Sequence, residues 1–121
     1  MNPRQKAYFR KKLLDWQDDI IRQTRQTIEE LNSDSLQHAD LTDRASSETD
    51  RAMELRARDR QRKLINKINQ ALKRLDNDEY GYCEETGEPI GVRRLEARPI
   101  ATLSIEAQER HERREKVYRD D

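Results

Sequence analysis

Apolar residues recur at helical spacing along the first part of the chain. Four of them follow one another at intervals of four, three and four positions, which places them on one face of an α-helix: Phe9, Leu13, Trp16 and Ile20. The same stripe is continued by Ile21, Ile28 and Leu31. No glycine or proline interrupts the segment from Arg4 to Asn32, so the pattern predicts one uninterrupted helix there.

A second apolar stripe runs from about Asp43 to Leu75. Its members are Leu55, Leu64, Ile65, Ile68, Ala71, Leu72 and Leu75. The stretch between the stripes, residues 32–43, is rich in Ser, Asp and Asn, as expected of a connection between helices. Two helices of roughly 30 residues joined in this way predict an antiparallel coiled-coil hairpin, about 45 Å long.

The helical pattern breaks after Leu75 and returns only from Ile105 to Tyr118. We therefore predict a mainly all-α fold with two parts: a hairpin (1–75) with an acidic tip around 33–45, and a small zinc-finger-like lobe with a terminal helix (76–121). The lobe is expected to close by apolar packing of Tyr82, Ile90, Val92, Leu95, Ile100, Leu103 and Ile105.

Composition supports long, solvent-exposed helices. Only 32% of the 121 residues are hydrophobic and 41% are charged. The 25 basic and 25 acidic residues cancel, which excludes a general electrostatic attraction to nucleic acid or to a membrane surface. There is no apolar run of transmembrane length and no signal-peptide pattern, so we expect a cytoplasmic protein.

The single cysteine lies in a sequence that resembles a zinc knuckle. A four-cysteine site beginning at Cys83 would place its other ligands at Thr86, Ser104 and Ala107. Hydroxyl groups are poor zinc ligands and alanine offers none, so we predict that the lobe binds no zinc. His111 is interpreted as a surface residue of the last helix and not as a second ligand.

Cys83 has two interpretations, a redox-sensing thiol or an inert, buried one. Three glutamates follow closely, at positions 84, 85 and 88, and nearby negative charge is expected to raise the pKa of the thiol. This expectation favours the inert thiol.

The connection between the long helices carries two carboxylates, Asp40 and Asp43. Asp43 is well placed as the N-cap of the second helix. A cap needs only one such residue, however, and two carboxylates at the end of a long rod are also suited to a metal ion or basic groups deep inside a partner. Neither a nucleotide-binding glycine loop nor a Ser/His/Asp set is present in the sequence, so we predict no enzymatic activity.

Three segments together resemble the DksA/TraR family of bacterial RNA polymerase regulators. They are the tip DLTDRA (40–45), the helical segment ELRARDRQRKLINKI (54–68) and the run GYCEETGEPIGVRRLEARP (81–99). The resemblance extends from about Tyr8 to Glu115. With only Cys83 kept among the ligand positions, the chain resembles the zinc-independent branch of this family.

The resemblance implies a monomeric, non-enzymatic factor that binds RNA polymerase and not specific DNA. It implies insertion of the hairpin through the secondary channel, destabilisation of open complexes at stable-RNA promoters, and action together with the alarmone ppGpp. Matching tip residues are Asp40, Asp43 and Ala45. Matching residues of the ppGpp and polymerase interface are Leu64, Lys67 and Arg98, whereas a further basic position holds Gln108, which leaves the strength of the ppGpp synergy open. One alternative is a Gre-like transcript-cleavage cofactor, whose acidic tip would hold a catalytic metal. The other is a purely structural coiled-coil adaptor, in which tip substitutions would have no effect.

Overall fold

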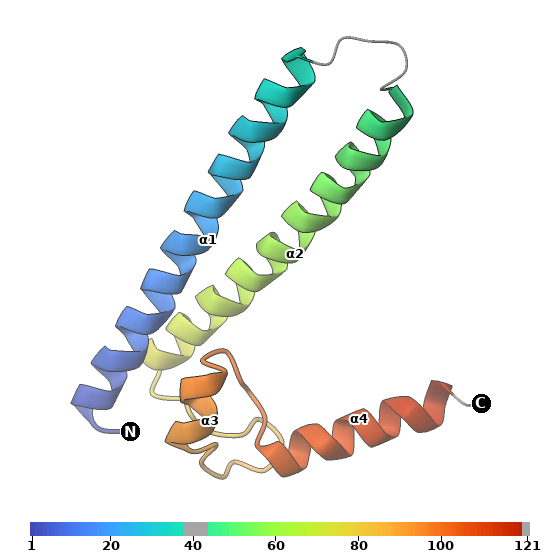
Figure 1. The fold of residues 1–121 in the computed structure, drawn as a ribbon. Coiled ribbons are helices and arrows are strands. Elements are labelled where there is room, and N and C mark those ends of the chain that lie inside the picture. The colour runs from blue at the N-terminus through green and yellow to red at the C-terminus, as the bar shows by residue number, and fades with distance from the viewer. Residues whose placement is uncertain (38–43, 120–121) are drawn as a thin grey trace. The chain divides into compact units, whose positions relative to one another are not determined.

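The computed structural model describes the backbone of residues 1–37 and 44–119, and the side chains of residues 1–30 and 48–117. It contains four helices in that part of the chain: α1 (Pro3–Gln37), α2 (Arg44–Asp76), α3 (Val92–Ala97) and α4 (Ile105–Arg119) (Figure 1). The described residues form no β-strand, only an isolated antiparallel bridge between Tyr82 and Pro89. The mainly helical fold predicted from the sequence is confirmed.

The helices differ from the sequence prediction in one boundary and in one additional helix. Helix α1 continues past Asn32 to Gln37, into the polar stretch expected to be a connection. Ser, Asp and Asn cost only a few tenths of a kcal/mol each in a helix interior, so an established helix propagates through them. Helix α3 was not predicted, because six residues are too few for a recognisable apolar period.

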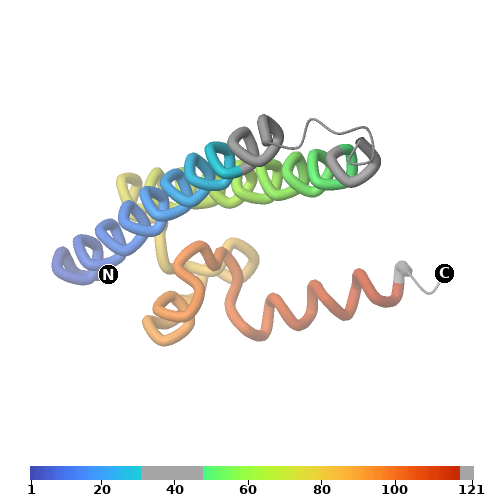
Figure 2. Tube along the Cα trace, turned by 45° about the horizontal axis from the view of Figure 1, so that its top comes forward, coloured from blue at the N-terminus to red at the C-terminus, as the bar shows by residue number. Residues whose placement is uncertain are grey.

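The described residues divide into two compact units, which we describe separately. The first unit, residues 14–68, holds the antiparallel parts of α1 and α2 (Figures 1 and 2). Ile20 and Ile68 are buried there, and Trp16 and Leu64 are half-buried. The hydroxyl of Thr24 lies within hydrogen-bonding reach of the Ile20 carbonyl, at 2.8 Å, and of the Gln61 side-chain oxygen. The contact between α1 and α2 in this unit, which we call the seam, is therefore partly polar.

Two residues predicted in this seam lie outside it. Ile21 is 37% exposed and Leu55 is 59% exposed. Ile21 follows the buried Ile20 by one residue, which rotates it about 100° around the helix. Leu55 lies thirteen residues before Ile68, a rotation of about 140° from the buried face. Apolar character at roughly helical spacing was thus insufficient to assign these two side chains to the seam.

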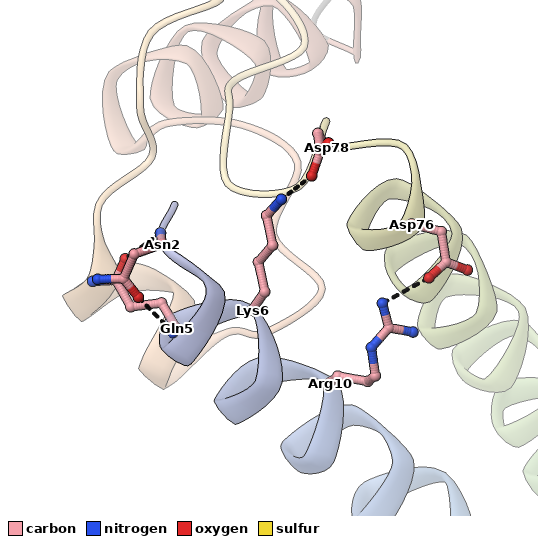
Figure 3. Close-up of polar contacts among 6 residues, drawn as sticks. All are labelled: Asn2, Gln5, Lys6, Arg10, Asp76 and Asp78. Atoms are coloured by element: carbon pink, nitrogen blue, oxygen red, sulfur yellow. Dashed lines mark hydrogen bonds and ion pairs between the residues drawn. The ribbon is translucent and has the colours of Figure 1, made fainter.

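The second unit combines residues 1–13 with residues 69–121. Its first helix begins with a reciprocal cap, in which the Gln5 backbone N–H donates to Asn2 Oδ1 at 2.8 Å and the Asn2 nitrogen donates to Gln5 Oε1 at 3.2 Å (Figure 3). One turn apart on α1, Lys6 pairs with Asp78, and Arg10 pairs with Asp76 at 2.6 Å (Figure 3). The start of α1 is thereby joined to the end of α2.

The core of this second unit is made of apolar side chains from all four helices and from the knuckle between α2 and α3. Its buried members are Phe9, Leu13, Ala71, Leu75, Tyr80, Cys83, Ile90, Leu95 and Ala107. The rings of Phe9 and Tyr80 lie 5.7 Å apart.

Three residues predicted to close the lobe are instead exposed: Tyr82, Val92 and Ile105. Val92 and Ile105 are the first residues of α3 and α4. The buried positions are Leu95, one turn later in α3, and Ala107, on the opposite side of α4 from Ile105. The prediction that Ile90 and Leu95 are buried is confirmed.

In the described part of the chain, no helix is long and apolar enough to cross a membrane.

Candidate functional site

The knuckle sequence forms a tight backbone turn. The Cys83 N–H donates to the Glu88 carbonyl at 2.8 Å, and the Gly87 N–H donates back to the Cys83 carbonyl at 2.8 Å. Gly87 has φ +73°, in the left-handed region that favours glycine. The Ile90 N–H closes the outer pair with the Gly81 carbonyl at 2.7 Å. These backbone hydrogen bonds therefore set the path of the turn.

Hydrogen bonds connect the four positions at which a zinc knuckle would carry its ligands. These positions are Cys83, Thr86, Ser104 and Ala107. The Cys83 sulfur accepts hydrogen bonds from the Thr86 hydroxyl and from the backbone of Ser104. The Ser104 Oγ in turn accepts the Ala107 N–H at 3.2 Å, in the manner of an N-cap for α4. Thr86 Oγ1 accepts the Glu88 N–H at 3.3 Å, so both hydroxyls bond to backbone groups.

The pKa of Cys83 moves in the direction opposite to our expectation. Burial by itself raises the pKa of the thiol, which is 2% exposed. Hydrogen bonds from the Thr86 hydroxyl and from the backbone of Ser104, Thr86 and Glu85 outweigh burial and lower the pKa from 9.0 to about 6. The prediction that neighbouring glutamates raise the pKa is therefore wrong, because donors directed at the sulfur decide its charge.

The side chains at these four positions do not fit a tetrahedral zinc site. Cys83 offers one sulfur, Thr86 and Ser104 offer hydroxyls that already bond the backbone, and Ala107 offers a methyl group. Among the described residues, no group of three or more His, Cys, Asp or Glu side chains is arranged to hold a metal. His111 is exposed on α4, 3.9 Å from Glu85 and 3.6 Å from Glu115.

Arg74 in the last turns of α2 holds the knuckle to that helix, a role that the sequence did not indicate. Its guanidinium donates to the Tyr82 carbonyl at 2.8 Å, to the Glu79 carbonyl at 3.3 Å and to the Glu84 carboxylate at 2.9 Å. Its own carbonyl accepts the N–H groups of Glu79 and Tyr80. The only sequence signal was a basic residue near a helix C-terminus, which is common.

The predicted interface residues lie in both units. Leu64 and Lys67 are one turn apart on α2 in the first unit, the former half-buried and the latter exposed. Arg98 directly follows α3 in the second unit and is exposed. Gln108, on α4, donates to Glu112 Oε1 at 3.2 Å.

The chain around Arg98 is held by three side-chain contacts to backbone carbonyls. The Lys12 Nζ donates to the Glu96 carbonyl at 2.9 Å, and the Tyr80 hydroxyl donates to the Pro99 carbonyl at 2.7 Å. The Arg94 Nε donates to the Leu103 carbonyl at 2.9 Å. The segment on both sides of Arg98 is thus anchored.

The tip lies largely outside the described residues. This applies to Asp40 and Asp43, including the predicted N-cap. Ala45 belongs to the first turn of α2, which begins at Arg44, and only its backbone is described. The assignment of these three residues stays a prediction.

Comparison with known families accounts for this combination of a helical hairpin and a knuckle. Residues 5–75 match the N-terminal domain of the DnaK suppressor protein DksA, and residues 78–113 match the prokaryotic DksA/TraR C4-type zinc finger. The chain belongs to the DksA/TraR family.

Individual relatives agree with this assignment. The RNA polymerase-binding transcription factor DksA of Caulobacter vibrioides is 67% identical over all of this chain and 85% of its own length. The protein of the same name from Escherichia coli K12 is 42% identical, over 96% of this chain and 77% of its own. The solved structure of transcription factor DksA2 from Pseudomonas aeruginosa superimposes with a TM-score of 0.88, at 45% identity over 96% of this chain and 89% of that one.

Proposed function

We propose that this protein is a transcription regulator that binds RNA polymerase directly. The observation that carries the proposal is family membership over both parts of the chain, together with 67% identity to a relative named as an RNA polymerase-binding transcription factor. The proposed working parts are the hairpin of residues 1–75 and the lobe of residues 76–121. No catalytic residue is part of the proposal.

The hairpin is proposed to enter the secondary channel of the polymerase. From Leu14 to its end at Gln37, α1 spans roughly 36 Å at 1.5 Å per residue, a reach suited to a deep channel. Asp40, Asp43 and Ala45 would act at the far end, where they destabilise open complexes at stable-RNA promoters. The alarmone ppGpp is the proposed effector, bound with the participation of Leu64, Lys67 and Arg98.

We propose that the lobe folds without a metal ion. We also propose that the protein is a monomer. The knuckle turn is closed by backbone hydrogen bonds, and its four aligned positions are connected by donors to the Cys83 sulfur and by the Ser104 cap. These contacts would supply the cross-links that a zinc ion supplies elsewhere.

The experiment measures open-complex lifetime and transcription from a ribosomal RNA promoter with purified polymerase. We expect the wild-type chain to shorten the lifetime, more strongly with ppGpp. Asp43→Asn should abolish the effect while polymerase binding persists. Asp15→Asn, the same charge change at an exposed position of α1, is the matched control and should behave like wild type.

Two results would contradict the proposal. The first is a wild-type protein that neither binds polymerase nor changes open-complex lifetime. The second is shortening of RNA in backtracked complexes, which would identify the Gre-like cleavage activity instead.

A further inference from the structure

We propose that Lys12 is a positioning residue for Arg98, with Tyr8 supporting it through the Glu96 carboxylate. The inference rests on the proposed function, in which Arg98 contacts the polymerase-bound effector. It adds residues from the first helix, far away in sequence, to that site. All four residues belong to the same compact unit.

Glu96 is the point at which the first helix holds α3. The Lys12 ammonium donates to the Glu96 carboxylate at 2.8 Å and to its backbone carbonyl at 2.9 Å. The Tyr8 hydroxyl donates to the same carboxylate at 2.5 Å, and the Lys12 Nζ lies 5.9 Å from the centre of the Tyr8 ring. Bonds from Lys12 and then from Tyr8 hold the pKa of Glu96 below its usual range.

The bond to the Glu96 carbonyl matters more than the surface ion pair. Carbonyls at the end of a helix have no partner within the helix, and a lysine that binds one fixes the direction in which the chain leaves. Exposed ion pairs by themselves contribute little. Lys12 makes both contacts to Glu96, which is the last residue but one of α3.

The chain is then fixed on every side of Arg98. The Arg98 N–H donates to the Arg94 carbonyl at 2.7 Å, and the Arg98 carbonyl accepts the Ala101 N–H at 2.9 Å. The next carbonyl, of Pro99, is bound by Tyr80. Arg98 is thus an exposed residue whose backbone is held both before and after it.

A fixed backbone lowers the entropy lost when Arg98 binds an anionic group. Without the Lys12 contacts this ordering would take place only on binding, so their loss should weaken effector action by a factor of roughly two to ten. The loss should depend on the presence of Arg98, because Lys12 acts through it.

The test is a double-mutant cycle in which ppGpp is titrated into transcription reactions containing polymerase and the full chain. We expect Lys12→Met to raise the half-maximal ppGpp concentration, and Lys12→Arg to restore part of the effect. In the Arg98→Ala background, Lys12→Met should cause no further change. Lys11→Met, at the exposed neighbouring residue of α1, is the matched control.

The outcomes separate the two proposals. If Arg98→Ala has its own effect and Lys12→Met adds the same factor in both backgrounds, the positioning role is overturned while the proposed function stands. If Arg98→Ala leaves the ppGpp response unchanged, the effector role of Arg98 fails, and the positioning role fails with it. Should Lys12→Met unfold, Lys12→Gln is the second variant, because it also removes the ammonium group that makes both bonds to Glu96. Coupling of that variant to Arg98 supports the inference, and its absence overturns it.

Discussion

The hydroxyl of Tyr80 donates a hydrogen bond to the carbonyl oxygen of Pro99 at 2.7 Å, in the interior of the lobe. Tyr80 is 4% exposed, and burial raises the pKa of its phenol, although Arg74 acts in the opposite direction. The phenol therefore stays protonated and able to donate throughout the physiological pH range. This bond ties the beginning of the knuckle to the chain that follows α3.

Tyr80→Phe should destabilise the protein by about 1–3 kcal/mol, because the Pro99 carbonyl loses its donor in a site without ready access to water. Urea denaturation followed by circular dichroism measures the change. Tyr82→Phe is the control, since Tyr82 is 41% exposed and should tolerate the loss of its hydroxyl. Equal destabilisation by the two changes would contradict the importance of the Tyr80 bond.

Leu13→Ala should cost about 2–5 kcal/mol of unfolding free energy, because the side chain is 0% exposed and its removal leaves a cavity. The neighbouring Leu14 is 43% exposed, so Leu14→Ala should cost much less. The pair compares the same chemical change on two faces of one helix. A similar loss at both positions would show that the core of the second unit is not packed around Leu13 as described.

Metal content tests the metal-free lobe. Elemental analysis of purified protein should find far less than one zinc per chain, and a chelator should leave thermal unfolding unchanged. A triple variant, Thr86→Cys with Ser104→Cys and Ala107→Cys, supplies the missing ligands and should take up about one zinc ion per chain. Stoichiometric zinc in the wild-type protein would overturn the proposal.

The low pKa of Cys83 predicts a pH-dependent stability. The pKa is about 6 in the folded protein against 9.0 for an ordinary thiol, so the folded state favours the thiolate. The resulting stabilisation is complete above about pH 9, decreases as the pH falls, and is lost below about pH 6.

Cys83→Ser removes this titration, so the wild-type protein should lose more stability than the variant between pH 9 and pH 6. Denaturant unfolding of both proteins at several pH values measures the difference, and the ultraviolet absorbance of the thiolate gives the folded pKa directly. An absorbance transition near the ordinary thiol pKa would refute the predicted charge state.

Short-range periodicity was sufficient for the long helices. A helix repeats every 3.6 residues, so the spacing of Phe9, Leu13 and Ile20 already contains the direction of their side chains, and all three are buried. Local sequence also located the knuckle turn, because the residues that form it lie within one short segment. Family resemblance in three short motifs likewise required only the order of residues.

Tertiary structure alone decided which tyrosine is buried, the charge preference of Cys83 and the anchoring of Arg98. The pKa of Cys83 depends on a donor from Ser104, whereas the sequence displays only the neighbouring glutamates. Lys12 meets Glu96 across 84 positions of sequence, a contact that no periodic pattern encodes. Hydrogen bonding and burial act over a few ångströms in space, so their outcome is set by which distant segments the fold brings together.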